Sequence, residues 1–101
     1  MFKTVGVIGA GLMGSEIALV FALAGRHVKL NDTDPGLLDE SAKRLTRVLQ
    51  KGIDRGVYAE DAIQVVLPRI QFCPTLDEYV NCDLVVEAVF EDEEVKSTVF
   101  N

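Results

Sequence analysis

The chain has 101 residues, enough for one domain with a single core. Hydrophobic residues make up 49% and charged residues 26%, a balance that excludes both a disordered chain and a membrane-embedded one. The net charge is -6 and the ten Lys and Arg residues are scattered, so we expect no DNA or RNA partner.

The first predicted elements are a strand, a glycine-rich turn and a helix. Residues 4–8 (TVGVI) form a short β-branched run that is typical of a buried strand. Residues 13–24 are nearly all apolar helix formers, and Gly25 is suited to the C-terminal cap. Because residues 5–25 contain one charge, Glu16, a signal peptide or membrane anchor is an alternative. A charge in the middle of the segment and three glycines disfavour it, so we expect no membrane partner.

A second strand and a helical hairpin are predicted next. Residues 27–31 (HVKLN) read as a strand, and Pro35 suits the first turn of a helix. Leucines and valines at helical spacing extend this amphipathic helix to near Gly52 or Gly56. A shorter helix over residues 59–67 (AEDAIQVVL) should complete the hairpin.

The rest of the chain continues the alternation. We expect a third strand over residues 69–73, a turn of helix over 77–80, a fourth strand over 83–89 (DLVVEAV) and the start of another helix over 91–101. Strands that alternate with helices specify an α/β fold, a Rossmann-type parallel sheet with helices on both faces. We expect it to be truncated after about the fourth strand, which leaves an open edge and favours a homo-oligomer.

Three glycines and one acid suggest a nucleotide site. Gly9 permits a tight turn, Gly11 lets the backbone approach a pyrophosphate, and Gly14 lets the helix pack close to the strand. Asp32 follows the second strand, where a carboxylate can bind both ribose hydroxyls and repel a 2′-phosphate, so NAD is favoured over NADP. The alternative is that the glycines only form a turn and Asp32 only caps a helix.

Three stretches together resemble a known family. Residues 7–25 (VIGAGLMGSEIALVFALAG), 28–32 (VKLND) and 83–96 (DLVVEAVFEDEEVK) are similar to the NAD-binding domain of the L-3-hydroxyacyl-CoA dehydrogenases, including the 3-hydroxybutyryl-CoA dehydrogenases. The resemblance covers essentially the whole chain. It implies that residues 1–101 are the N-terminal portion of a Rossmann domain, with the substrate and dimerisation domain outside this chain. It also implies hydride transfer between NAD and the 3-hydroxyl of an L-3-hydroxyacyl-CoA, the substrate partner, in fatty-acid or short-chain acyl-CoA metabolism.

The resemblance also implies a set of cofactor-binding residues. They are Gly9, Gly11, Leu12, Met13, Gly14, Asp32, Ala88, Val89, Phe90, Glu91 and Lys96. Ala88 to Phe90 match the segment beneath the nicotinamide half of NAD, and Glu91 and Lys96 match residues near it. The acidic run after Glu91 departs from the family, in which a small polar residue is common at that point.

The helical hairpin matches the part of the family that leans over the acyl-CoA. A serine that touches CoA in some relatives falls at Val48, and a lysine falls at Arg55, so these CoA contacts are in doubt. Arg44, Arg47 and Lys51 are further basic candidates for the CoA phosphates. A plain solvated helix face is the alternative for most of them.

No catalytic residue is expected within this chain. The family uses a His held by a Glu as the base, and both fall beyond Asn101, so the chain alone should be inactive. The single histidine, His27, lies at the start of the second strand and is remote from the nicotinamide. Cys73 and Cys82 form no metal-binding or disulfide pattern, which favours a cytoplasmic compartment.

Two other functions share these sequence features. One is a related NAD-dependent dehydrogenase, of the lambda-crystallin-like gulonate type or the 3-hydroxyisobutyrate type. The other is a non-catalytic nucleotide-binding module.

Overall fold

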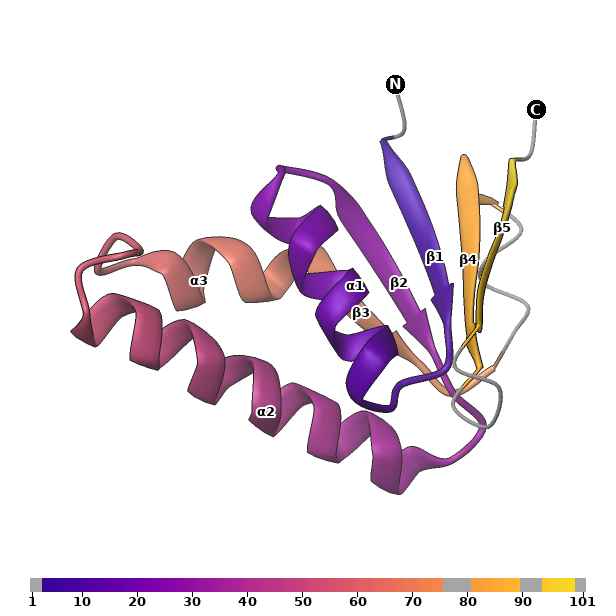
Figure 1. Cartoon of the computed structure of the whole chain (residues 1–101), viewed down its shortest axis with the longest axis horizontal. Helices are drawn as coiled ribbons and strands as arrows, with labels where there is room; N and C mark the ends of the chain where they lie inside the picture. The colour runs from indigo at the N-terminus through magenta and orange to yellow at the C-terminus, as the bar shows by residue number, and fades with distance from the viewer. Residues whose placement is uncertain (1–2, 76–80, 90–93, 100–101) are drawn as a thin grey trace.

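Five strands of the described residues form one sheet with the order β3-β2-β1-β4-β5. The computed structural model describes residues 3–75, 81–89 and 94–99 (Figure 1). The parallel strands are β1 (Thr4–Ile8), β2 (His27–Asn31), β3 (Ile70–Cys73) and β4 (Leu84–Val89). The four predicted strands are therefore confirmed. The first strand is flanked by the second and the fourth, as a doubly wound sheet requires.

The helices also match the sequence pattern closely. They are α1 (Leu12–Leu23), α2 (Pro35–Asp54) and α3 (Ala62–Val66), followed by the 3-10 turn η1 (Leu67–Arg69). Asp34 caps α2, because its Oδ1 accepts a hydrogen bond from the Gly36 N–H at 2.8 Å, and Pro35 takes the first helical position. Gly25 ends α1 with a φ of 89°, which suits glycine.

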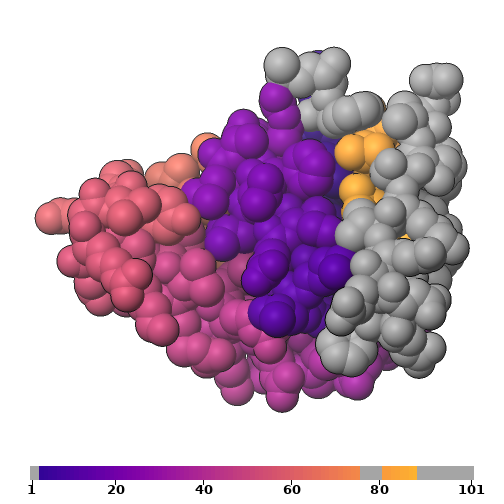
Figure 2. All heavy atoms as spheres, in the orientation of Figure 1, coloured from indigo at the N-terminus to yellow at the C-terminus, as the bar shows by residue number. Residues whose placement is uncertain are grey.

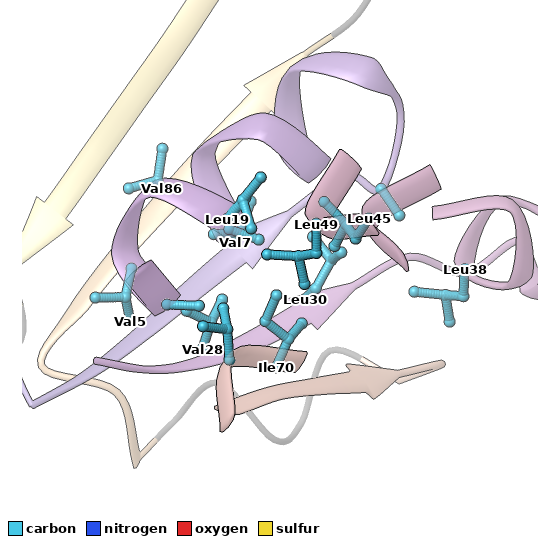
Figure 3. Packing of buried hydrophobic residues seen from close by; sticks show 14 of the residues in the cluster. Val5, Val7, Leu19, Val28, Leu30, Leu38, Leu45, Leu49, Ile70 and Val86 are labelled. Carbon is cyan, nitrogen blue, oxygen red and sulfur yellow. The ribbon is translucent and has the colours of Figure 1, made fainter. Parts of the chain in front are cut away.

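The core lies between the sheet and the helices (Figure 3). Alternate strand residues such as Val7 and Leu30 point toward the helices, where Leu45 and Leu49 of α2 meet them. All four side chains are at most 1% exposed. This packing explains why the amphipathic pattern of α2 predicted its position.

The outer face of α1 remains at the molecular surface (Figure 2). Its sequence is apolar nearly all round, yet Leu12 is 53% exposed and Val20 is 64% exposed. Between them, Glu16 is also exposed. No helix within residues 3–75, 81–89 and 94–99 combines the length and the apolar character that a membrane span requires.

The helices of the described residues lie on one side of the sheet (Figure 1). Helix α1 contacts α2, and α2 contacts α3. The predicted cover on both faces is therefore confirmed for one face. The predicted turn of helix over residues 77–80 falls outside the described residues.

The last element differs from the prediction. A helix was expected over residues 91–101, but Glu94–Val99 forms β5, which pairs with β4 in antiparallel orientation. The segment contains β-branched Val95, Thr98 and Val99, and the edge of β4 offers unpaired N–H and C=O groups that a strand satisfies and a helix does not. The expectation of an open β4 edge was therefore wrong, and so was this reason for a homo-oligomer.

Candidate nucleotide-binding site

The turn between β1 and α1 depends on two tightly packed glycines. Gly9 has a φ of 105°, and a Cβ atom there would overlap the carbonyl oxygen of Ala88 in β4. A Cβ atom on Gly14 would overlap the carbonyl oxygen of Gly9. These two positions therefore need glycine for the fold itself, one for its backbone conformation and both for space.

Gly11 is different, because nothing lies within 4 Å of the place where its Cβ atom would be. Its φ of -69° is accessible to any residue, so its conformation does not require glycine. Gly11 is instead the residue at which the backbone is bare toward open space. This is the arrangement that lets a ligand approach the main chain.

The N-terminus of α1 faces the same opening. The first backbone hydrogen bond of the helix runs from the Ser15 N–H to the Gly11 C=O at 3.0 Å, so the N–H groups of residues 12–14 have no partner within the helix. Gly11 occupies the cap position, and no side chain caps this end of α1. Unpaired N–H groups and the positive end of the helix dipole favour an anion here.

Asp32 lies beside this loop, directly after β2. Its Oδ2 accepts from the Ala10 N–H at 2.9 Å, and its Oδ1 accepts from the Asp34 N–H at 2.9 Å. The side chain is half-buried, and each carboxylate oxygen keeps a second lone pair for a further donor. The Gly9 N–H also donates to the Asn31 C=O at 2.7 Å, so β2 holds the glycine loop through two residues.

The loop lies at the switch point of the sheet. From β1 the chain crosses to β2 and then β3 on one side, whereas β4 occupies the other side of β1. Doubly wound sheets bind nucleotides in the crevice at the carboxyl ends of such neighbouring strands. Gly9 and Ala88 stand at this end of β1 and β4, so two segments of the predicted site come together.

The remaining predicted residues are only partly located. The backbone of Val89 ends β4, whereas Phe90 and Glu91 lie outside the described residues. Lys96 was expected on a helix and instead belongs to β5, where its Cα is in register with that of Glu87. The roles of these residues in cofactor binding stay predictions.

Two residues near the loop were missed by the sequence reasoning. Ser15 and Ser41 are both 0% exposed, and their hydroxyl oxygens are 2.6 Å apart. The only sequence signal was a small polar residue directly after the third glycine and a serine at an apolar position of α2. Neither signal identifies the partner, because the two residues are 26 positions apart.

The helical hairpin contains a separate groove of about 280 Å³. It is lined by Val48, Lys51, Gly52, Arg55, Val57 and Tyr58. Val48 and Arg55, matched by sequence to CoA contacts, therefore line one groove together with a second cation, Lys51. Arg44 and Arg47 line a different, polar hollow nearer the N-terminus of α2.

His27 and the two cysteines lie away from the loop. His27 is exposed at the start of β2, about 13 Å from the end of that strand by the rise of a β-strand. Cys73 and Cys82 are both buried, and burial raises the pKa of Cys82. A raised pKa makes the Cys82 thiol a poor nucleophile at neutral pH.

These residues fit a dinucleotide. The open space at Gly11 and the unpaired N–H groups of α1 suit a pyrophosphate, and the free lone pairs of Asp32 suit ribose hydroxyls. The fit rests on backbone donors at the loop and one acidic side chain, with no basic residue in the glycine turn itself.

Comparison with known proteins identifies similar domains. The family described as "3-hydroxyacyl-CoA dehydrogenase, NAD binding domain" matches residues 4–101. A 3-hydroxybutyryl-CoA dehydrogenase of Bradyrhizobium diazoefficiens is 42% identical over 101 residues, all of this chain and 34% of that protein. A fatty acid oxidation complex subunit alpha of Idiomarina loihiensis is 39% identical over 99 residues, 96% of this chain and 14% of that subunit.

A solved structure has the same fold. The crystal structure of FadB2 of Mycobacterium tuberculosis matches with a TM-score of 0.85 and 34% identity, over 90% of this chain and 32% of that one. The chain thus spans about a third of the length of the 3-hydroxybutyryl-CoA dehydrogenase that it matches.

Proposed function

The chain belongs to the 3-hydroxyacyl-CoA dehydrogenase NAD-binding domain family, and from this premise we propose that it binds NAD at the carboxyl ends of β1, β2 and β4. In the whole protein this domain would serve hydride transfer between NAD and the 3-hydroxyl group of a 3-hydroxyacyl-CoA. The observation that carries the proposal is the open space over Gly11 beside the unpaired N–H groups of α1 and the carboxylate of Asp32.

The pyrophosphate is proposed to lie over Gly11. The N–H groups of residues 12–14 would donate to its oxygens, and the α1 dipole would stabilise its charge without a basic side chain. Leu12 and Met13 contribute through their backbone in this arrangement, which explains why an exposed apolar residue such as Leu12 is compatible with the site.

Asp32 is proposed to select NAD over NADP. Its carboxylate already accepts two backbone N–H groups and has lone pairs left for the adenosine ribose hydroxyls. A 2′-phosphate would face this negative charge, and the neighbouring exposed residues Thr33 and Asp34 offer no cation to offset it.

The proposed chemistry divides between cofactor and protein. Bound NAD supplies the hydride acceptor, and the protein holds and orients it. Among the described residues, Ala88 and Val89 at the end of β4 are proposed to lie at the nicotinamide end of the cofactor. Alcohol oxidation also needs a proton acceptor, and His27 is at the wrong end of the sheet for that role. We therefore expect this chain alone to be inactive.

The acyl-CoA is proposed to contact the groove of α2. Lys51 and Arg55 provide positive charge for CoA phosphates, and Val48 and Val57 provide apolar surface beside them. Replacing Arg55 with Ala should raise the KM for acetoacetyl-CoA in the whole protein and leave NAD affinity unchanged. Lys43→Ala is the matched control, because Lys43 is a cation of α2 that does not line this groove and pairs with Asp39 at 3.1 Å.

Calorimetric titration tests the cofactor proposal directly. The chain should bind NAD more tightly than NADP, and Gly11→Val should abolish NAD binding while the thermal transition persists. Ala24→Val adds the same side chain at the exposed far end of α1 and should leave NAD affinity unchanged. Equal NAD affinity of Gly11→Val and the unaltered chain would show that the loop is only a turn.

We propose a cytoplasmic location on the basis of the two cysteines. Cys73 at the end of β3 and Cys82 just before β4 are both buried, and two cysteines without a metal-binding or disulfide pattern are compatible with the reducing cytoplasm. A homo-oligomer stays a prediction without a surface assigned to it.

A further inference from the structure

A buried pair of hydroxyl groups connects α1 to α2. Ser15 lies in the first turn of α1 and Ser41 lies in the second turn of α2, and both are 0% exposed. The Ser15 Oγ is 2.6 Å from the Ser41 Oγ, 2.8 Å from the Gly11 C=O and 3.3 Å from the Ala10 C=O. The pair therefore reaches the carbonyl groups of the glycine loop from within the core.

The direction of these hydrogen bonds follows from their partners. A carbonyl oxygen can only accept, so the single proton of Ser15 must be donated to Gly11 or shared with Ala10. The short contact between the two hydroxyls then requires Ser41 to donate to Ser15. The chain of donors runs from α2 through Ser15 to the glycine loop.

The carbonyl group at the end of this series of hydrogen bonds belongs to Gly11, the residue whose backbone faces open space. The Gly11 C=O also accepts from the Ser15 N–H at 3.0 Å, so Ser15 binds it through both backbone and side chain. The peptide plane that follows Gly11 includes the N–H of Leu12, the first unpaired donor of α1. A fixed Gly11 carbonyl therefore fixes the direction of that N–H.

We propose that Ser15 and Ser41 are positioning residues of the dinucleotide site, which set the orientation of the peptide between Gly11 and Leu12 toward the pyrophosphate. This inference rests on the proposed function. The loop is held on its other side by β2, through the bonds of Gly9 to Asn31 and of Ala10 to Asp32. The serine pair holds the Gly11 carbonyl, whereas the bonds to Asn31 and Asp32 hold Gly9 and Ala10.

A purely structural role would give a different result from a positioning role. If the role were purely structural, loss of the hydroxyls would lower thermal stability and leave ligand binding intact in the folded protein. A positioning role affects ligands that contain the pyrophosphate and spares those that contain only adenine and ribose. NAD and ADP-ribose belong to the first group, and adenosine belongs to the second.

The test compares Ser15→Ala, Ser41→Ala and the double variant in the full chain. Each single variant should weaken binding of NAD and ADP-ribose by about 3- to 10-fold in calorimetry, as expected for one buried hydrogen bond. Adenosine binding, followed by NMR, should change by less than about twofold on the same argument. The double variant should bind NAD about as well as the weaker single one, because both residues act through one bond chain.

Further variants distinguish a positioning role of the Ser41 hydroxyl from a role in packing alone. Ser41→Thr keeps the hydroxyl and should retain most of the NAD affinity. Thr46→Ala is the control for loss of a hydroxyl, because the Thr46 Oγ1 donates to the Ala42 C=O at 2.8 Å in the same helix, away from the loop. If Ser41→Ala does not fold, Ser41→Cys replaces it, since a thiol keeps the volume and weakens the bond.

Three outcomes would contradict the inference. They are unchanged affinity for NAD and ADP-ribose in folded Ser41→Ala or Ser41→Cys, an equal loss for adenosine, and an equal loss in the Thr46 control. Absence of NAD binding by the unaltered chain would instead overturn the proposed function, so the two failures are distinguishable.

Discussion

The carboxylate of Asp32 is bonded to the backbone of Ala10, with its Oδ2 2.9 Å from the Ala10 nitrogen. The acid that follows β2 thus holds the loop that follows β1. Because the residue proposed to bind the ribose also supports the pyrophosphate loop, a substitution at Asp32 should affect both parts of the dinucleotide.

The first prediction concerns cofactor choice. Asp32→Ser together with Thr33→Arg should weaken NAD binding by about 1 to 3 kcal/mol, because two hydrogen bonds of roughly 0.5 to 1.5 kcal/mol each are lost. NADP binding should improve, since an arginine can pair with the 2′-phosphate. Calorimetric titration with both cofactors measures the change.

Thr33→Arg alone is the control for this pair of changes, because it adds the cation and leaves Asp32 in place. It should keep the preference for NAD. A double variant that still prefers NAD would mean that Asp32 supports the loop without binding the ribose.

The second prediction separates two glycines by function. Gly14→Ala should unfold or strongly destabilise the domain, because its Cβ would overlap the carbonyl oxygen of Gly9. Gly11→Ala meets open space and should cost about 1 kcal/mol or less of stability. Thermal unfolding distinguishes them, and similar melting temperatures for the two variants would contradict the assignment.

The third prediction concerns acid stability. The Oδ2 of Asp83 accepts from the N–H groups of Thr4 at 3.1 Å and Lys3 at 2.9 Å, which holds the pKa of Asp83 below its ordinary value of 3.8. A lowered pKa in the folded state means that the carboxylate stabilises the fold above the unfolded pKa. This contribution is lost as the pH falls through the lower, folded value.

Thermal unfolding of Asp83→Asn between pH 2 and pH 6 tests this sign. The unaltered chain should be more stable than the variant at pH 6. The difference should shrink below about pH 4, where the Asp83 carboxyl of the unfolded chain becomes protonated. A difference that stays constant over this range would show that Asp83 does not titrate with folding.

The fourth prediction concerns the far end of α1. The Arg69 Nη1 donates to the Ala22 C=O at 2.8 Å, so a half-buried cation caps the negative end of the helix. Arg69→Met should lower the free energy of unfolding by about 1 kcal/mol. NAD affinity should be unchanged, because Ala22 is at the opposite end of α1 from Gly11. A large loss of NAD affinity in folded Arg69→Met would contradict this separation.

Local patterns in the sequence predicted most of the fold. The β-branched runs at Thr4–Ile8 and His27–Asn31 and the amphipathic spacing of Pro35–Asp54 lie where the structure has β1, β2 and α2. The spacing of Gly9, Gly11 and Gly14 likewise predicted a turn open to a ligand. These features depend on contacts within a few residues, which a pattern in one segment can report.

Tertiary structure decided the features that join distant segments. The pairing of Ser15 with Ser41, of Arg69 with Ala22 and of Asp83 with Lys3 spans 26, 47 and 80 positions. No spacing rule predicts such partners, because they depend on how whole elements pack. The strand Glu94–Val99 is the clearest case. Its acidic start favoured a helix, and the unpaired edge of β4 made it a strand.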